Sequence, residues 1–262
     1  MSRAAPAVVG PATYLYALVR RGRAPAVGGT PAGLPGLGPA RALAVDRGLW
    51  LIAADAPRDS YTEAAIERGL QDMAWVSGCA LAHEAVVEHF AVAGPLLPMK
   101  LFTLFASDER ARQHVRRRQA GLAKALDKVA GRSEWGVRLS GDGRAAAVAS
   151  RPAAGPRSGT QFLLAKKAQR EQAGQQAERA GAAAEGLFEA LAEHADGATR
   201  RPIVVPKTGK RLWLDAAFLV ARGRSRSFQA ALKREAQRLE RLGYRVTLTG
   251  PWPPYNFVGS IS

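Results

Sequence analysis

The hydrophobic pattern opens with the apolar run YLYALV at Tyr14–Val19, which predicts a buried β-strand. A Gly- and Pro-rich loop over residues 22–40 follows it. Two short apolar stretches come next, at 41–46 and 48–55, and the turn between them at Asp46–Gly48 is typical of a hairpin. The beginning of the chain therefore predicts one strand and a β-hairpin.

Helical spacing replaces this pattern after residue 58. Ser60 and Glu63 are spaced as a capping box, which predicts that a helix begins there and breaks near Gly69. A second helix is expected to follow and to end at Gly94–Pro95. Its apolar face is predicted to contain Trp75, Cys79, Ala82, Val86 and Phe90.

The stretch LLPMKLFTLFA at residues 96–106 predicts another strand, and residues 107–131 predict one further helix. Ser107 is the expected N-cap of that helix, and the acidic residues Asp108 and Glu109 suit the positive end of its dipole. Gly131 is expected to end it. The apolar stripe of this helix is predicted to contain Val115, Leu122, Leu126 and Val129.

The second half of the chain predicts six elements in a regular order. Glu134–Leu139 is a strand, and a Gly/Pro/Ser-rich stretch over 141–159 separates it from a long helix at 160–194. Strands at 201–206 and 212–222 are expected around the turn KTGK. An amphipathic helix at 225–243 and a last strand at 244–250 complete the order. The helix is expected to face inward through Phe228, Leu232, Leu239 and Leu242.

This order, β-α-β-β-α-β, is the ferredoxin-like arrangement of an antiparallel sheet with two helices on one face. The predicted fold class is therefore α+β, with two domains. The N-terminal α+β domain is expected to cover residues 1–133 and the C-terminal ferredoxin-like domain residues 134–249. If this division is right, Glu134–Leu139 must pair with a strand of the second half.

Residues 250–262 form a C-terminal arm that contains the stretch GPWPPYNFV. Its three prolines exclude a helix and a central strand, and they make the arm stiff. Because exposed aromatic clusters lower solubility, we expect the arm to clasp a groove on this same chain, between the two domains. In that clasp Trp252 and Phe257 are largely buried and Asn256 bonds to backbone groups. The alternative is that Trp252, Tyr255, Asn256 and Phe257 dock on a partner protein.

Composition narrows the class of protein. Hydrophobic residues make up 47% of the 262 positions, which is ordinary for a globular chain, and no run is apolar enough to span a bilayer. One cysteine, Cys79, excludes an internal disulfide framework and favours a reducing, cytoplasmic setting. Pro6, Gly10 and Pro11 interrupt the N-terminal apolar run and argue against a signal peptide.

No motif for catalysis, a metal or a cofactor is found. The segment HEAVVEH holds His83, Glu84, Glu88 and His89, but its histidines are six positions apart instead of the four that a zinc protease needs. We expect these four residues on the outer side of a helix. The segment KTGKR lacks the first glycine and the final Ser/Thr of a phosphate loop, so it is interpreted as a hairpin turn.

The net charge of +16 leaves two other classes of protein open. A basic ferredoxin-like domain could bind RNA, but Trp213 and Phe218 on the relevant strand are predicted to point to opposite sheet faces. The basic helix at 227–242 could instead bind an anionic membrane, although its apolar stripe is better explained as domain core.

Six segments, in order from residue 14 to 258, together resemble the gas vesicle proteins GvpL and GvpF. They are YLYALV, GLGPARALAVDRGLWLIAADAP, LLPMKLFTLFASDERARQHV, EWGVRL, GTQFLLAKKAQRE and GPWPPYNFV. The most specific pieces are LLPMKLFTLFASDE, which begins the third segment, and GPWPPYNFV. One departure is Lys100 with Phe102-Thr103, where the family usually has Arg and Phe-Gly.

The resemblance implies a two-domain α+β protein with a modified ferredoxin-like C-terminal domain. It also implies an accessory or minor structural role in building gas vesicles, in contact with the small hydrophobic shell protein GvpA and other vesicle proteins. It implies no catalytic residue or cofactor. Neither the L- or F-type identity nor the oligomeric state follows from it.

Overall fold

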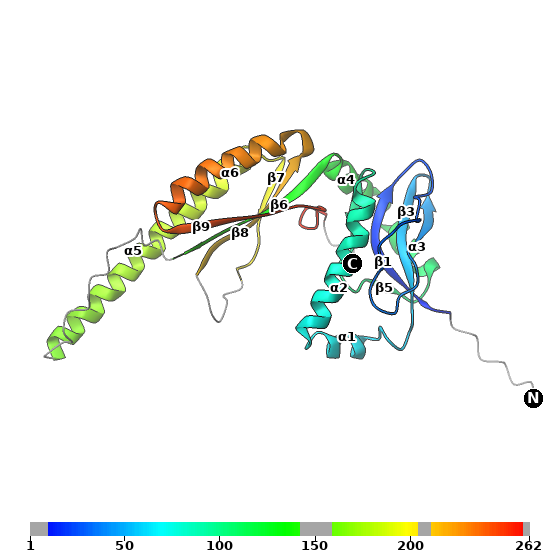
Figure 1. Ribbon diagram of the computed structural model, residues 1–262, viewed down its shortest axis with the longest axis horizontal. Helices are drawn as coiled ribbons and strands as arrows, with labels where there is room; N and C mark the ends of the chain where they lie inside the picture. The colour runs from blue at the N-terminus through cyan, green and yellow to red at the C-terminus, as the bar shows by residue number, and fades with distance from the viewer. Residues whose placement is uncertain (1–9, 142–158, 204–210, 259–262) are drawn as a thin grey trace, which may run out of the picture. The chain divides into compact units, whose positions relative to one another are not determined.

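The computed structural model describes residues 10–141, 159–203 and 211–258. Their contacts divide the chain into two compact units (Figure 1). Unit 1 contains the chain up to Gly131 together with the segment from Trp252 onward, and unit 2 is Arg132–Pro251. The predicted division lay at residue 133. The arm, predicted as a separate segment, is divided between the two units.

The sheet of unit 1 has the strand order β2-β3-β1-β4, and β5 also pairs with β1. The strands are β1 (Ala12–Arg20), β2 (Arg41–Asp46), β3 (Leu49–Ala56), β4 (Leu96–Pro98) and β5 (Leu104–Phe105). The hairpin predicted at Asp46–Gly48 is confirmed, since β2 and β3 pair antiparallel around it. Gly48 has φ +72°, a backbone conformation that few other residues adopt without strain.

The helices of unit 1 lie on both faces of this sheet. They are α1 (Glu63–Gly69), α2 (Met73–Ala91), α3 (Asp108–Arg117) and α4 (Gln119–Val129). The neighbouring strand residues Thr13 and Tyr14 hydrogen-bond to α3 and α2 respectively. Because side chains alternate along a strand, α2 and α3 cover opposite faces.

Three predictions about unit 1 were wrong in detail. The N-cap of α1 is Thr62, whose hydroxyl accepts from Ala65 N, so Ser60 and Glu63 do not form a capping box. The strand predicted at 96–106 is two strands. A continuous strand in the register of β4 would place Leu101 opposite Tyr14, but Leu104 lies there instead. The helix predicted at 107–131 is broken at Arg118, which has a non-helical backbone. Its Ser107 cap and its apolar stripe are confirmed, since Val115, Leu122, Leu126 and Val129 are buried.

Unit 2 has a four-stranded sheet in the order β7-β8-β6-β9. Its elements along the chain are β6 (Arg132–Gly141), α5 (Gly159–Ala192), β7 (Gly197–Arg200), β8 (Leu212–Ala221), η1 (Arg222–Arg224), α6 (Ser225–Glu240) and β9 (Tyr244–Trp252). The predicted pairing of Glu134–Leu139 with a C-terminal strand is confirmed, because β6 pairs antiparallel with β8 from Arg132 to Ser140.

One core joins both helices of unit 2 to one face of its sheet. Trp135 and Val137 of β6 and Phe218 of β8 meet Leu187 and Leu191 of α5 and a set of residues from α6 in this core. The α6 residues are Phe228, Ala231, Leu232 and Leu239. Since all of them share a single cluster, α5 and α6 cover the same face (Figure 1).

Other predictions about unit 2 need correction. The segment Arg201–Ile203 is not a strand; β7 precedes it at Gly197–Arg200, and the KTGK turn lies outside the described residues. Leu242 is 46% exposed instead of facing inward. Gly243 adopts φ +84° as predicted for the cap, and Tyr244 joins the core. The edge strand β9 continues through Pro251, and prolines are tolerated on edge strands because one side of such a strand bonds to no neighbouring strand.

Candidate functional site

The C-terminal arm packs on unit 1. Pro253, Pro254, Phe257 and Val258 are buried, and two tight backbone bonds, Tyr255 N to Pro253 O and Phe257 N to Pro254 O, fold the segment into turns. The Lys128 ammonium of α4 lies 5.6 Å from the centroid of the Phe257 ring. Apolar burial and a cation–π contact therefore hold the end of the arm on unit 1.

Tyr255 fixes the arm to α2. Its hydroxyl donates to Glu84 Oε2 at 2.6 Å, a bond between residues 171 positions apart. Burial, and then the nearby Glu84 carboxylate, raise the pKa of Tyr255 well above its ordinary value, so the phenol keeps the proton that it donates. The prediction that Glu84 lies on the solvent side of α2 was therefore incomplete, because the arm covers it.

The four predicted arm residues have different surroundings. Tyr255 and Phe257 contact unit 1, as a clasp on the same chain requires. Trp252 is 40% exposed, so its predicted burial was wrong: it ends the edge strand β9 before the chain turns onto unit 1. Asn256 is exposed on the turn, and its bonds to backbone groups stay a prediction.

His83 is the site residue that sequence reasoning misplaced most. It was predicted on the outer side of the helix, yet it is 3% exposed. Its Nδ1 lies 2.7 Å from Tyr14 Oη, and its Nε2 lies 3.1 Å from Met99 O. Because a carbonyl only accepts, Nε2–H donates to Met99 and the Tyr14 hydroxyl donates to Nδ1. Glu88 and His89 are exposed, as predicted.

This Tyr14–His83 pair holds the segment between β4 and β5. Tyr14 Oη also accepts from Phe102 N at 3.4 Å, and Phe102 has φ +63°, an uncommon conformation for a non-glycine residue. Phe102 stacks on Trp75 with ring centroids 5.2 Å apart. The interruption of the predicted strand is thus stabilised by a hydrogen-bonded and stacked arrangement, which gives His83 a structural role.

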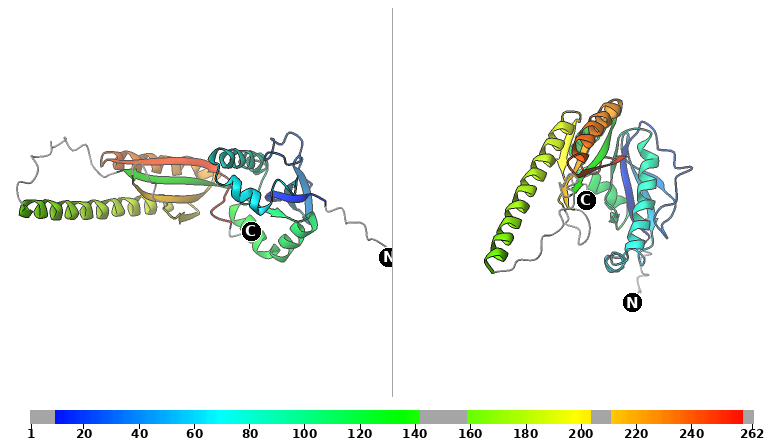
Figure 2. Two further views of the ribbon diagram at one scale, coloured as in Figure 1. Left: turned by 90° about the horizontal axis from the view of Figure 1, so that it is seen from below. Right: turned by 60° about the vertical axis from the view of Figure 1, so that its left-hand side comes forward.

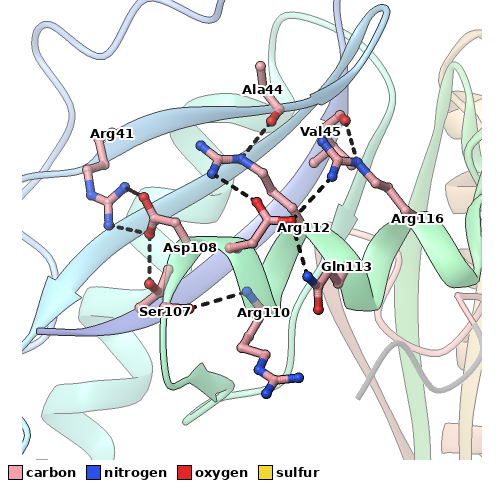
Figure 3. Close-up of polar contacts among 11 residues, drawn as sticks. Arg41, Ala44, Val45, Ser107, Asp108, Arg110, Arg112, Gln113 and Arg116 are labelled. Atoms are coloured by element: carbon pink, nitrogen blue, oxygen red, sulfur yellow. Dashed lines mark hydrogen bonds and ion pairs between the residues drawn. The ribbon is translucent and has the colours of Figure 1, made fainter. Parts of the chain in front are cut away.

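A second polar cluster fastens α3 to the exposed edge of the sheet (Figure 3). Arg41 donates to both oxygens of Asp108 at 2.7 Å, and the buried Thr13 hydroxyl donates to Asp108 as well. The guanidinium groups of Arg112 and Arg116 donate to the carbonyls of Ala44 and Val45 on β2. These arginines cover an edge that could otherwise pair with another strand.

Replacing Arg41 by alanine is expected to destabilise unit 1 by about 1–2 kcal/mol, because Asp108 would lose its bidentate partner. Urea unfolding measures the loss. Arg110→Ala is the matched control, since the Arg110 side chain points away from the cluster (Figure 3) and its removal takes away the same charge. Equal stability losses in the two variants would contradict the structural role of Arg41.

The described strands β6 and β8 of unit 2 lack the aromatic platform that an RNA-recognition module uses. Phe218 is fully buried in the helix-covered core, and Trp213 packs against that core too, so the prediction that the two point to opposite faces was wrong. The pairing of β6 with β8 shifts register between Leu139 and Ser140, next to Trp213, and this shift interrupts the regular alternation of side chains along β8. The residues of β6 and β8 that point away from the helices include Gly136, Arg138, Asp215 and Ala217, none of which is aromatic.

In the described part of the chain, no three His, Cys, Asp or Glu side chains form a group that could hold a metal ion. None of the described helices is both long and apolar enough to cross a bilayer. A small groove of about 330 Å³ in unit 1 is lined by Arg21, Arg23, His89 and Phe90, among others. Arg21 uses its guanidinium to bond the carbonyls of Phe90 and Pro95, so it serves the structure of the groove wall.

Known proteins are similar to this chain over nearly its whole length. Residues 12–259 match the family described as gas vesicle synthesis protein GvpL/GvpF. Gas vesicle protein L of Streptomyces sp. (strain CB03234) is 31% identical over 253 residues, which cover 94% of this chain and 92% of that protein.

Two crystal structures show a similar fold. They are GvpF from Anabaena sp. PCC7120, with a TM-score of 0.67 at 20% identity, and GvpF from Microcystis aeruginosa, with a TM-score of 0.66 at 18% identity. The similarity covers 95% and 96% of this chain, and 96% and 99% of those chains. The mixed α+β fold is therefore shared with solved gas vesicle proteins.

Proposed function

Because this chain belongs to the GvpL/GvpF family of gas vesicle proteins, we propose that it is an accessory or minor structural protein needed for gas vesicle assembly. In this role it binds the hydrophobic shell protein GvpA and other vesicle proteins in the cytoplasm. The observation that carries the proposal is the family match over residues 12–259.

The architecture supports a binding role. We assign unit 2 a ferredoxin-like fold, supported by the order β6-α5-β7-β8-α6-β9 along the chain and β7-β8-β6-β9 across the sheet. The polar clusters of unit 1 are engaged in holding its own elements together. A protein of this kind acts through its surfaces, and a net charge of +16 helps to keep it soluble while it binds an apolar partner.

The test is a deletion of the gene from its gas vesicle cluster. The deletion strain is expected to lose buoyancy and to show few or no vesicles by electron microscopy, and the wild-type gene supplied in trans should restore both. Complementation by the Arg110→Ala variant serves as a control for expression of a folded protein. Normal numbers of vesicles in a deletion strain without a second family member would contradict the proposal.

A further inference from the structure

Thr160 and the residues from Phe162 to Arg179 of α5 lie outside the core of unit 2. The helix has 34 residues, and its buried positions begin only at Ala180. Thr160 and residues 162–175 are all exposed. At 1.5 Å per residue this free part extends for roughly 30 Å, and Figures 1 and 2 show α5 running well beyond the strands of its sheet.

Three consecutive apolar residues end this free part. Phe162, Leu163 and Leu164, which we call the α5 tip, are 53%, 65% and 63% exposed. Successive residues of a helix are about 100° apart, so the three side chains surround the helix end instead of forming one stripe. Such a run of exposed apolar residues adds nothing to the core of unit 2, and it carries a solubility cost that a binding role would explain.

A group of cations borders the tip. Lys166, Lys167 and Arg170, the basic collar, follow it within two turns, with Glu171 as the nearest carboxylate. The Lys166 ammonium lies 6.0 Å from the centroid of the Phe162 ring, and Lys167 lies 3.9 Å from Glu171. The tip therefore suits a partner that offers an apolar surface bordered by carboxylates.

A second copy of this chain does not fit these charges. Two tips docked end to end would bring two basic collars together, and like charges repel. Side-by-side pairing along the core-facing stripe would place the polar residues Lys166, Gln169 and Gln176 at the contact. The chemistry favours a different protein with an exposed apolar face.

We propose that the α5 tip is the surface through which this protein docks on the vesicle shell protein. The three apolar side chains enter an apolar surface of the shell subunit, and the basic collar pairs with carboxylates at its border. This inference rests on the proposed function and adds to it the surface that performs the binding.

The experiment compares full-length proteins for co-sedimentation with purified shell protein. Replacing Phe162, Leu163 and Leu164 together by serine should weaken binding at least about tenfold, with the thermal unfolding of unit 2 unchanged because these residues lie outside its core. The matched control replaces three exposed apolar residues of unit 1, Leu70, Leu81 and Val92, by serine and should bind as the wild type does. Lys166→Gln with Lys167→Gln should reduce the salt dependence of binding.

The outcomes separate this inference from the proposed function. If the wild type binds the shell protein and the tip variant binds equally well, the docking surface is elsewhere and the inference is overturned, while the proposed function stands. If the wild type does not bind, both fail. If the tip variant loses only flotation with phosphatidylglycerol vesicles and keeps its affinity for the shell protein, the tip is a lipid-binding element and the inference is wrong.

Discussion

Replacing Phe257 by alanine is expected to cost unit 1 about 3 kcal/mol of stability, because the substitution empties a buried aromatic site. Phe257 is 8% exposed, lies between the buried Pro254 and Val258, and receives the Lys128 ammonium over its ring. The loss can be measured by amide hydrogen exchange in unit 1. Backbone amides of the elements that the arm covers should exchange faster in the variant, because these elements unfold locally more often when the arm is loosened.

Trp252→Ala is the matched comparison. It removes a larger aromatic ring from the same arm, yet we expect a cost of about 1 kcal/mol, because a ring that is 40% exposed leaves little cavity behind. Equal costs for the two variants would contradict the assignment of Phe257, and not Trp252, as the anchor of the clasp. A Trp252→Ala protein that is stable but supports no vesicles would show that the exposed ring contacts a partner.

Acid is expected to destabilise unit 1 through His83. Burial lowers the pKa of His83 from 6.5 to about 4, although its bond to Met99 O acts in the opposite direction. In the unfolded chain the imidazole takes up a proton near pH 6.5, whereas in the folded chain it resists protonation until about pH 4. The unfolded state therefore binds more protons between these values, and stability falls as the pH is lowered through them.

The expected size is about 2–3 kcal/mol between pH 7 and pH 4.5, from 1.36 kcal/mol for each unit of pKa difference. Urea unfolding at a series of pH values measures it. His83→Gln keeps one acceptor toward Tyr14 and one donor toward Met99 and does not titrate, so its stability should depend less on pH. His89→Gln, at an exposed position on the same helix, is the matched control. If wild type and His83→Gln show the same slope, His83 is not the titrating group.

The repeat of apolar positions along the chain was enough to identify most of the helices and strands. Residues two positions apart in a strand, and three or four apart in a helix, lie on the same face. The apolar face of such an element can therefore be predicted from the sequence without the tertiary structure. The Ser107 cap and the glycines at positions 48 and 243 could also be predicted from the sequence. The cap bonds to a nearby backbone N–H, and the two glycines adopt positive φ angles, so each depends only on the local backbone. The segments that resemble the GvpL/GvpF family also follow from the sequence alone.

The tertiary structure decided the points at which distant residues compete with local pattern. His83 is polar and was assigned to the solvent, but Tyr14, 69 positions away, provides a buried partner that makes the neutral ring stable in the core. The same pair fixes the interruption at 99–103, where the apolar pattern continues and gives no local sign of a break.

The C-terminal arm is a second case in which residues far apart in the sequence decide the structure, and here the separation reaches 171 positions. Its three prolines and three aromatic residues predicted a stiff segment that packs on the chain, and sequence could give no more than that. Whether Trp252 or Phe257 is the buried ring depends on where β9 ends and on the surface that α2 and α4 present to the arm. Both rings are hydrophobic enough to be buried. Which of them is buried depends on contacts with residues more than a hundred positions away in the sequence.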